Sequence, residues 1–515
     1  MPVLELIETK LEKLQSRTIL PILAVVLLGL ILRIYFTPWH LSSSAPDALV
    51  YLIEGLAYTR GDFSYFSSRF LWPAFLSMFV VFFKFDDHLG YMTVIRAVSI
   101  SVSVATIPIL YLISKQFVEK KYAIAAAAFF AIEANIVENS TFAITEPMFI
   151  LLGLVSFYFI VQKNEKYMPL AFVFAGLSFD TRLNGVVLFL LLVLACAMKI
   201  RPKMRLTKIL LAGTGIFLAT SFPHLYVPLS QGEIPFLFHF TSVGTVVSHG
   251  ETFTATYIPS ETQTTFSILK TAFTREFLHV FRISVPYLAI LAPIGFIVAL
   301  KDLDFQKKIM FATIIISLII ALPQYTISAE YRNLFFITPF FSILSAIGIQ
   351  KLWSNIEMKN IFLILLIAGL LLVSFSFLRD RYESHIQQDI ERELVGKYVV
   401  NNFVGRIMGN EYNQISHNIA GAKIGTSDGR GNVFNDKLSI VVPMKPVDTA
   451  EKLIQTVKTL KVDYLVVDNE YDRRYAIFQD VFYNEKNYPY LKKVFDSDDS
   501  EYKKIRVKIF EIVGN

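Results

Sequence analysis

Long apolar runs separated by short polar loops follow one another from residue 19 to residue 378. Each run is long enough, or nearly long enough, to cross about 30 Å of hydrocarbon as a helix. Eleven membrane-spanning helices are predicted, at residues 18–36, 90–114, 122–138, 147–162, 169–181, 184–199, 209–228, 277–300, 309–328, 333–350 and 360–378. A composition that is 54% hydrophobic, with a mean hydropathy of +0.50, agrees, because one soluble core could not bury that much apolar surface.

The loops between these runs alternate in charge. Basic residues gather in loops 115–121, 162–167, 199–208, 301–308 and 351–359, and the positive-inside rule places those loops in the cytoplasm with the N-terminus. A further apolar run, 70–83, would reverse this order if it crossed the membrane, so we expect it to lie along the outer surface. The chain is thus expected to be a multi-pass protein of the cell membrane with an external C-terminus. Because topology explains most of the basic residues, no nucleic-acid partner is expected.

Beyond residue 378 the pattern changes to that of a soluble domain. A β-branched run at 437–443, a helical pattern at 449–461 and a second strand at 462–468 predict a βαβ unit, and strands are predicted at 491–497 and 504–513. The expected fold class is therefore a polytopic α-helical membrane protein with a C-terminal soluble α/β domain. Its predicted domains are a transmembrane domain, 1–378, with a large first external loop, 37–89, and an external domain, 379–515.

Two carboxylates lie at the predicted outer face of the membrane. Asp47 begins a short amphipathic pattern in which Tyr51 and Glu54 follow at spacings of four and three, so the three side chains share one helical face. Glu146 lies at the outer end of another span, just before Pro147. The alternative for both is structural, since an acidic residue in the first turn stabilises a helix by capping it or complementing its dipole.

Cations also lie at this face, where the positive-inside rule disfavours them. Arg182 in "FDTRLNG" and Arg332 in "AEYRNLFF" occupy outer ends of spans. Such residues usually pair or bind a ligand, although snorkelling to lipid headgroups is an alternative. Together, carboxylates that accept a proton and arginines that neutralise a phosphate are the groups needed to move a substituent off a lipid phosphate.

The order of these motifs resembles that of the GT-C glycosyltransferases, in particular the protein O-mannosyltransferases and lipid A aminoarabinose transferases. Asp47 matches the acidic residue of their first external loop, although Ala48 replaces the second acid of the usual Asp-Glu pair. The segment "RFLWPAFLSMFVVFF" (69–83) resembles their membrane-surface helix, and "RAVSISVSV" (96–104) resembles the start of the next span. The motifs "ITEPMF", "DTRLNGVV" and "YRNLFFITPF" resemble later elements, the last with Tyr before Arg instead of after it.

The resemblance implies an inverting glycosyltransferase that takes a sugar from a polyprenyl-phosphate donor and transfers it to a protein, glycan or lipid acceptor outside the membrane. It implies that Asp47 is the general base, that Glu146 orients hydroxyls, and that Arg182 and Arg332 contact the phosphate. Arg96 is a weaker candidate for the phosphate, because pairing inside the bundle explains it equally well. Tyr51 and Glu54 are counted with the substrate-binding residues.

The sequence also leaves alternatives, one of which is a non-catalytic membrane scaffold whose C-terminal tail binds a partner and in which Asp47 only caps a helix. A transporter or lipid flippase is the main rival, although transporters usually place polar groups near the bilayer midplane within repeats, and no repeat is visible here. Oligosaccharyltransferases of the same class hold a divalent cation, which Asp47, Glu146 and Glu138 could imitate, but no Asp-x-Asp motif supports this, and we expect no metal cofactor. His239, His249 and Glu251 are interpreted as polar loop residues, because zinc needs three or four convergent ligands.

Overall fold

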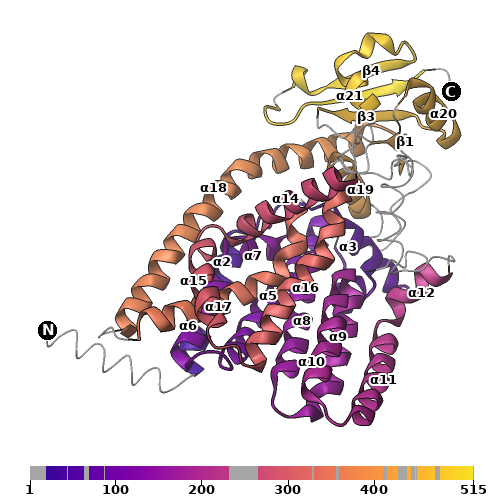
Figure 1. Ribbon diagram of the computed structural model, residues 1–515. Helices are drawn as coiled ribbons and strands as arrows, with labels where there is room; N and C mark the ends of the chain where they lie inside the picture. Colours follow the sequence, from indigo (N-terminus) through magenta and orange to yellow (C-terminus); the bar gives the residue numbers. More distant parts are fainter. Residues whose placement is uncertain are drawn as a thin grey trace.

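The chain folds into a helical bundle that carries a small sheet at one end (Figure 1). The computed structural model describes residues 19–42, 45–62, 69–85, 87–230, 265–327, 330–354, 359–409, 414–426, 438–441, 447, 449–469, 476–500 and 502–513. The long helix α18 (Lys359–Asn402) runs from the bundle to the sheet and joins the two parts of the molecule (Figure 1).

The bundle is built from helices of different lengths. Its first part contains α2 (Ile19–Tyr35), α3 (Pro46–Tyr58), α4 (Leu71–Val80), α5 (His88–Ser114), α6 (Lys120–Ala131), α7 (Ala134–Thr141), α8 (Glu146–Val161), η1 (Glu165–Tyr167), α9 (Met168–Thr181), η2 (Leu183–Gly185), α10 (Val186–Lys199), α11 (Lys203–Thr220) and α12 (Phe222–Ser230). Its second part contains α14 (Thr265–Ser284), α15 (Leu288–Leu300), α16 (Phe305–Ile327), η3 (Tyr331–Ile337), α17 (Thr338–Leu352) and α18. Every predicted span therefore coincides with helical structure.

Several predicted spans are not single helices, which corrects the sequence interpretation. The span 209–228 is divided at Ser221 between α11 and α12, and the span 333–350 begins in η3 and continues as α17. The span 277–300 is divided between α14 and α15, which meet at a bend of 103° around Pro286. The span 122–138 breaks before α7, where the Glu133 carboxylate caps the new helix by accepting from the backbone N–H of Ile136 at 2.7 Å. These last two breaks support each other, because the Asn135 amide donates to the backbone carbonyls of Arg282 (3.3 Å) and Val285 (3.1 Å). A hydropathy profile cannot detect such hydrogen bonds, which satisfy backbone groups at the ends of helices far apart in the sequence.

Among the described residues, four helices are long and apolar enough to cross a membrane by themselves, and the bent pair would make a fifth. These four are His88–Ser114, Phe305–Tyr325, Tyr331–Leu352 and Asn360–Asn402. Helix α4, with 10 residues, is far shorter than the about 20 that a crossing requires, as expected for a helix on the surface. The total of eleven crossings stays a prediction.

Small residues allow the helices of the bundle to approach closely. At the contact of α15 with α17, a Cβ atom added to Gly295 would lie 1.6 Å from the Leu344 carbonyl oxygen. Only glycine fits at such a contact, as is common where helices pack in membranes. The large core of the bundle includes alanines along α6 and aromatic residues such as Phe157 and Phe340, whose rings meet edge to face at 4.9 Å.

The C-terminal part contains a five-stranded sheet with the order β2-β1-β3-β5-β4. Its elements are β1 (Gly405–Met408), α19 (Gln414–Thr426), β2 (Leu438–Val441), α20 (Ala450–Leu460), β3 (Tyr464–Asp468), α21 (Ala476–Tyr483), η5 (Glu485–Asn487), β4 (Leu491–Asp496), η6 (Ser497–Asp499) and β5 (Val507–Ile512). The predicted strands are found, and β1 lies between the two strands of the predicted βαβ unit, parallel to both. The sequence interpretation missed β1 and α19.

The two parts of the molecule share a hydrophobic core. Leu52 of α3 and Trp72 of α4 belong to the same buried cluster as Val395 of α18 and Ile419 of α19. Helix α18 passes through residue 378, the predicted domain boundary, without interruption. The segments of the first external loop that are described are thus packed against the C-terminal part at one end of the bundle.

Candidate functional site

Asp47 lies in the first turn of α3, at the end of the bundle that carries the C-terminal part. Its carboxylate does not cap α3, whose N-cap is Ala45 and which has no side-chain cap hydrogen bond. Instead, Asp47 Oδ2 lies 3.0 Å from a guanidinium nitrogen of Arg332 and 3.4 Å from one of Arg69. The side chain is 32% exposed, so this paired carboxylate still reaches solvent. The capping alternative therefore does not describe Asp47.

Arg332 joins the two candidate carboxylates. It lies in η3, and its Nε is 3.6 Å from Glu146 Oε1 while its terminal nitrogen contacts Asp47. Glu330, two residues earlier, accepts from the same Nε at 2.7 Å. The turn that leads into α17 therefore brings a cation between two helices, α3 and α8, that are far apart in sequence.

Glu146 begins α8 and its side chain is only 1% exposed. A buried carboxylate is costly unless it is paired, and two arginines supply that pairing. Arg182, at the end of α9, contacts Glu146 directly, and it donates to Thr145 Oγ1 at 3.1 Å and to Asn333 Oδ1 at 2.7 Å. Helix α8 has no side-chain cap hydrogen bond at its start, so Glu146 pairs with the arginines and does not cap the helix, although it lies in the first turn.

Arg69 is a fifth member that the sequence interpretation did not assign. It precedes α4, pairs with Asp47 and donates to the hydroxyl of Tyr51. Its position gives a signal that could have found it, because it is another cation at the predicted outer face. We call Asp47, Arg69, Glu146, Arg182 and Arg332 the charge cluster, and Tyr51 adjoins it.

The pKa of Asp47 follows from these neighbours. Burial alone would raise this pKa, but the positive charges of Arg332 and Arg69 outweigh burial and hold the pKa below its usual value. The pKa of Tyr51 is raised, mainly by burial. Asp47 is therefore ionised and Tyr51 carries its proton near neutral pH.

Two further predicted residues occupy different environments. Arg96 on α5 is buried and donates to four backbone carbonyls, those of Pro38, Leu41, Ser42 and Thr141, at 2.6 to 3.1 Å. These contacts favour the structural alternative over the role in phosphate binding. Glu54 is buried on α3 one turn beyond Tyr51, and the described ion pairs of the charge cluster do not include it.

The carboxylates are arranged unfavourably for a divalent cation. Asp47 and Glu146 both contact guanidinium groups, which repel a second cation, and Glu138 is engaged by Arg381 of α18. Within the described ranges, no three His, Cys, Asp or Glu residues form a group that could hold a metal ion. His239, His249 and Glu251 lie outside the described residues.

A segment of the chain matches a known enzyme family. Residues 71–227 match the sequence model of the family described as Dolichyl-phosphate-mannose-protein mannosyltransferase. This segment contains Arg96, Glu146 and Arg182. No curated protein sequence matches the chain significantly.

Solved structures share the fold along most of the chain. ArnT from Cupriavidus metallidurans in the apo state is 11% identical with a TM-score of 0.57, and the match covers 96% of this chain and 98% of ArnT. The same protein bound to undecaprenyl phosphate is 10% identical with a TM-score of 0.53, covering 95% of this chain and 97% of the other. The apo oligosaccharyltransferase of Archaeoglobus fulgidus is 11% identical with a TM-score of 0.55, covering 87% of this chain and 69% of the other.

At these identities the structural likeness establishes the fold. Together with the matched segment, it confirms the resemblance to GT-C transferases of the protein mannosyltransferase and ArnT type. The mostly helical architecture with several apolar helices is confirmed in the same way.

Proposed function

We propose that this chain is an inverting glycosyltransferase that moves a sugar from a polyprenyl-phosphate donor to an acceptor hydroxyl at the outer face of the cell membrane. The observation that supports the proposal most directly is the convergence of two carboxylates and three arginines from five separate segments. One of the structures with this fold contains undecaprenyl phosphate, a lipid phosphate of the required kind.

The proposed reaction is one displacement. The acceptor oxygen attacks the anomeric carbon as the bond from that carbon to the phosphate oxygen breaks, and the phosphate keeps the bonding electrons. Asp47 receives the proton of the acceptor hydroxyl. Attack and departure on opposite faces of the ring invert the anomeric configuration, by the geometry that applies to one-step glycosidases. The products are the glycosylated acceptor and the polyprenyl phosphate.

The arginines have a double role in this proposal. In the structure they neutralise Asp47 and Glu146, and guanidinium forks bind phosphate equally well. When a donor phosphate draws Arg332 and Arg69 away from Asp47, burial of that carboxylate is no longer opposed and its pKa rises. Asp47 thus becomes a stronger base when the donor is bound. Arg182 keeps Glu146 in place to orient hydroxyls.

Replacing Asp47 by Asn tests the assignment. The amide has the same shape but cannot take a proton, so the rate of transfer from a radiolabelled polyprenyl-phosphate sugar should fall by about 10²–10⁴. Purified protein in lipid would be compared at saturating donor, and the unfolding temperature should stay near that of the native chain. Ser101→Ala, on the exposed face of α5, is a matched control for protein handling. Undiminished transfer by Asp47→Asn would reject Asp47 as the base.

A further inference from the structure

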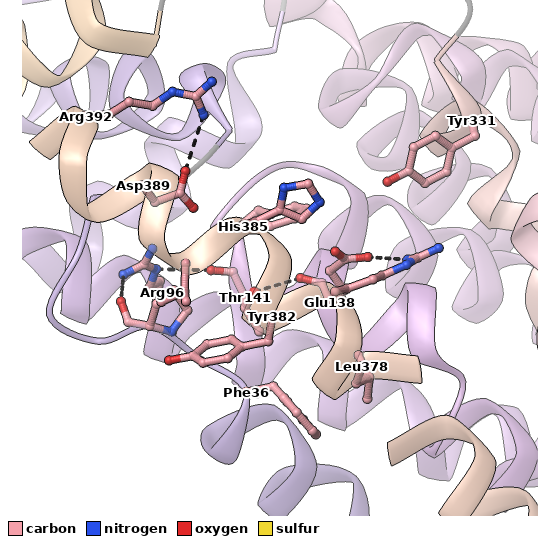
Figure 2. A pocket seen from close by; sticks show the side chains of 14 residues that line it. Phe36, Arg96, Glu138, Thr141, Tyr331, Leu378, Tyr382, His385, Asp389 and Arg392 are labelled. Carbon is pink, nitrogen blue, oxygen red and sulfur yellow. Dashed lines mark hydrogen bonds and ion pairs between the residues drawn. The ribbon is translucent and has the colours of Figure 1, made fainter. Parts of the chain in front are cut away.

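A second feature lies next to the charge cluster. A pocket of about 300 Å³ opens beside α18, just beyond the apolar part of that helix, and its walls include Phe36, Arg96 and Glu138 (Figure 2). Tyr331 also lines it, directly before Arg332 in the chain. We call it the α18 pocket. Its volume is at the lower end of the range for small-molecule sites.

The α18 pocket contains three arginines and two carboxylates, and each carboxylate is paired with an arginine. Arg381 contacts Glu138, and Arg392 lies 3.4 Å from Asp389 (Figure 2). Arg96 donates hydrogen bonds to four backbone carbonyls. A phosphate would have to compete with Glu138 and Asp389 for their arginines and would be repelled by both carboxylates. A neutral ligand meets neither this competition nor this repulsion.

The same lining suits a ligand rich in hydroxyls. A carboxylate has about four acceptor sites and a guanidinium has five donors, so each ion pair keeps capacity for further hydrogen bonds. Figure 2 shows the imidazole of His385, an exposed residue, between Asp389 and Tyr331. The rings of Phe36, Tyr331 and Tyr382 provide apolar faces of the kind that pack on the C–H groups of a ring.

We propose that the α18 pocket binds a neutral, polyhydroxylated sugar ring. Its assignment to a substrate rests on the proposed function, which offers two sources of such a ring: the sugar carried by the lipid-linked donor, or a sugar of a glycan acceptor. Both present the same hydroxyls and apolar ring face to Asp389, His385 and Tyr382.

Binding can be measured without the reaction. Methyl α-D-mannopyranoside is titrated into the purified full chain in lipid nanodiscs, and its saturation-transfer NMR signal gives the dissociation constant. His385→Ala and Asp389→Asn should each raise that constant about fivefold or more, because each removes hydrogen bonds to the ring. Glu383→Gln, which changes an exposed carboxylate on the same helix that pairs with Arg379, should bind as the native chain does. Inorganic phosphate should not displace the glycoside.

Three results would overturn the proposal: no binding by the native chain, equally tight binding by both pocket variants, or displacement by phosphate. A prenyl-phosphate mannose that displaces the glycoside, where prenyl phosphate alone does not, identifies the donor sugar as the ligand. Simultaneous binding of both identifies a glycan acceptor. Asp47→Asn should bind the glycoside normally, so transfer by that variant would reject the proposed base without affecting the result for the pocket.

Discussion

Arg332 and Arg96 differ in the partners that the fold gives them. Arg332 lies between the carboxylates of Asp47 and Glu146, and its side chain is 24% exposed. Arg96 is 1% exposed and donates to backbone carbonyls of the first external loop and of α7. An arginine paired with carboxylates can exchange them for another anion. An arginine that donates to buried carbonyls cannot move away without leaving those carbonyls with no hydrogen-bond donor. The first arrangement suits ligand binding and the second suits structure.

Of the two arginine replacements, Arg332→Met should have the larger effect on catalysis. Removing one cation from the departing phosphate is expected to lower kcat by about 10²–10³. Glu146 keeps Arg182 as a partner, so we expect the unfolding temperature to stay close to that of the native chain. Single-turnover transfer and thermal unfolding of the same preparation measure both quantities. An Arg332→Met protein with a lowered unfolding temperature but normal transfer would make Arg332 a structural residue.

Replacing Arg96 by Met should show the opposite pattern. Four buried carbonyls would lose a charged donor, and we expect a loss of about 2–5 kcal/mol in the free energy of unfolding. Transfer per folded molecule should change little. Thermal unfolding measures the loss of stability, and an assay of separated folded protein measures transfer. A stable but inactive Arg96→Met protein would assign Arg96 to the substrate site.

Replacing Tyr51 by Phe tests the edge of the charge cluster. The ring stays, but the hydroxyl that accepts from Arg69 is lost. Losing one such hydrogen bond should lower kcat/KM for the polyprenyl-phosphate sugar about two- to tenfold. Tyr91→Phe is the matched control, because the hydroxyl of Tyr91, on α5, accepts from the backbone N–H of Phe85 in the segment before that helix. Equal kcat/KM values for Tyr51→Phe and the native chain would exclude Tyr51 from the site.

The pH dependence gives the smallest effect. Because the pKa of Asp47 is held below its usual value of about 3.9, kcat/KM, which reports the free enzyme, should be constant from pH 8 down to about pH 5 and fall only at lower pH. In Arg69→Gln one opposing charge is gone and the pKa of Asp47 rises, so the acid limb should move to higher pH. An acid limb that moves downward or stays in place would contradict this electrostatic account.

Much of the membrane domain could be predicted because its determinants are local. A run of apolar residues specifies a buried helix wherever it lies, and the predicted runs all became helical. The breaks before α7 and α15 were missed because they depend on contacts between distant segments, as in the bonds from Asn135 to Arg282 and Val285. Strand β1 was missed since four residues, "GRIM", carry too short a pattern to distinguish a strand from a loop.

The candidate site was predicted in part for a related reason. Glu146, Arg182 and Arg332 were found because a charge at the outer end of an apolar span is unusual in any sequence, and Asp47 because it shares one helical face with Tyr51 and Glu54. The same signal could not distinguish the structural Arg96 from these site residues, because the neighbouring residues in the sequence do not show which groups a side chain contacts in the folded protein. Arg69 lies beside the short helix α4, outside the predicted spans.

The local residue pattern specifies a helical, apolar chain through residue 378, with charges that a membrane would not tolerate unpaired, followed by a separate α/β pattern. Which charges meet depends on the folded chain, because ion pairing requires distances of a few ångströms between α3, α8, α9 and η3. The tertiary structure also packs the C-terminal part against the described segments of residues 37–89, since shape and burial act between surfaces that the chain order does not bring together.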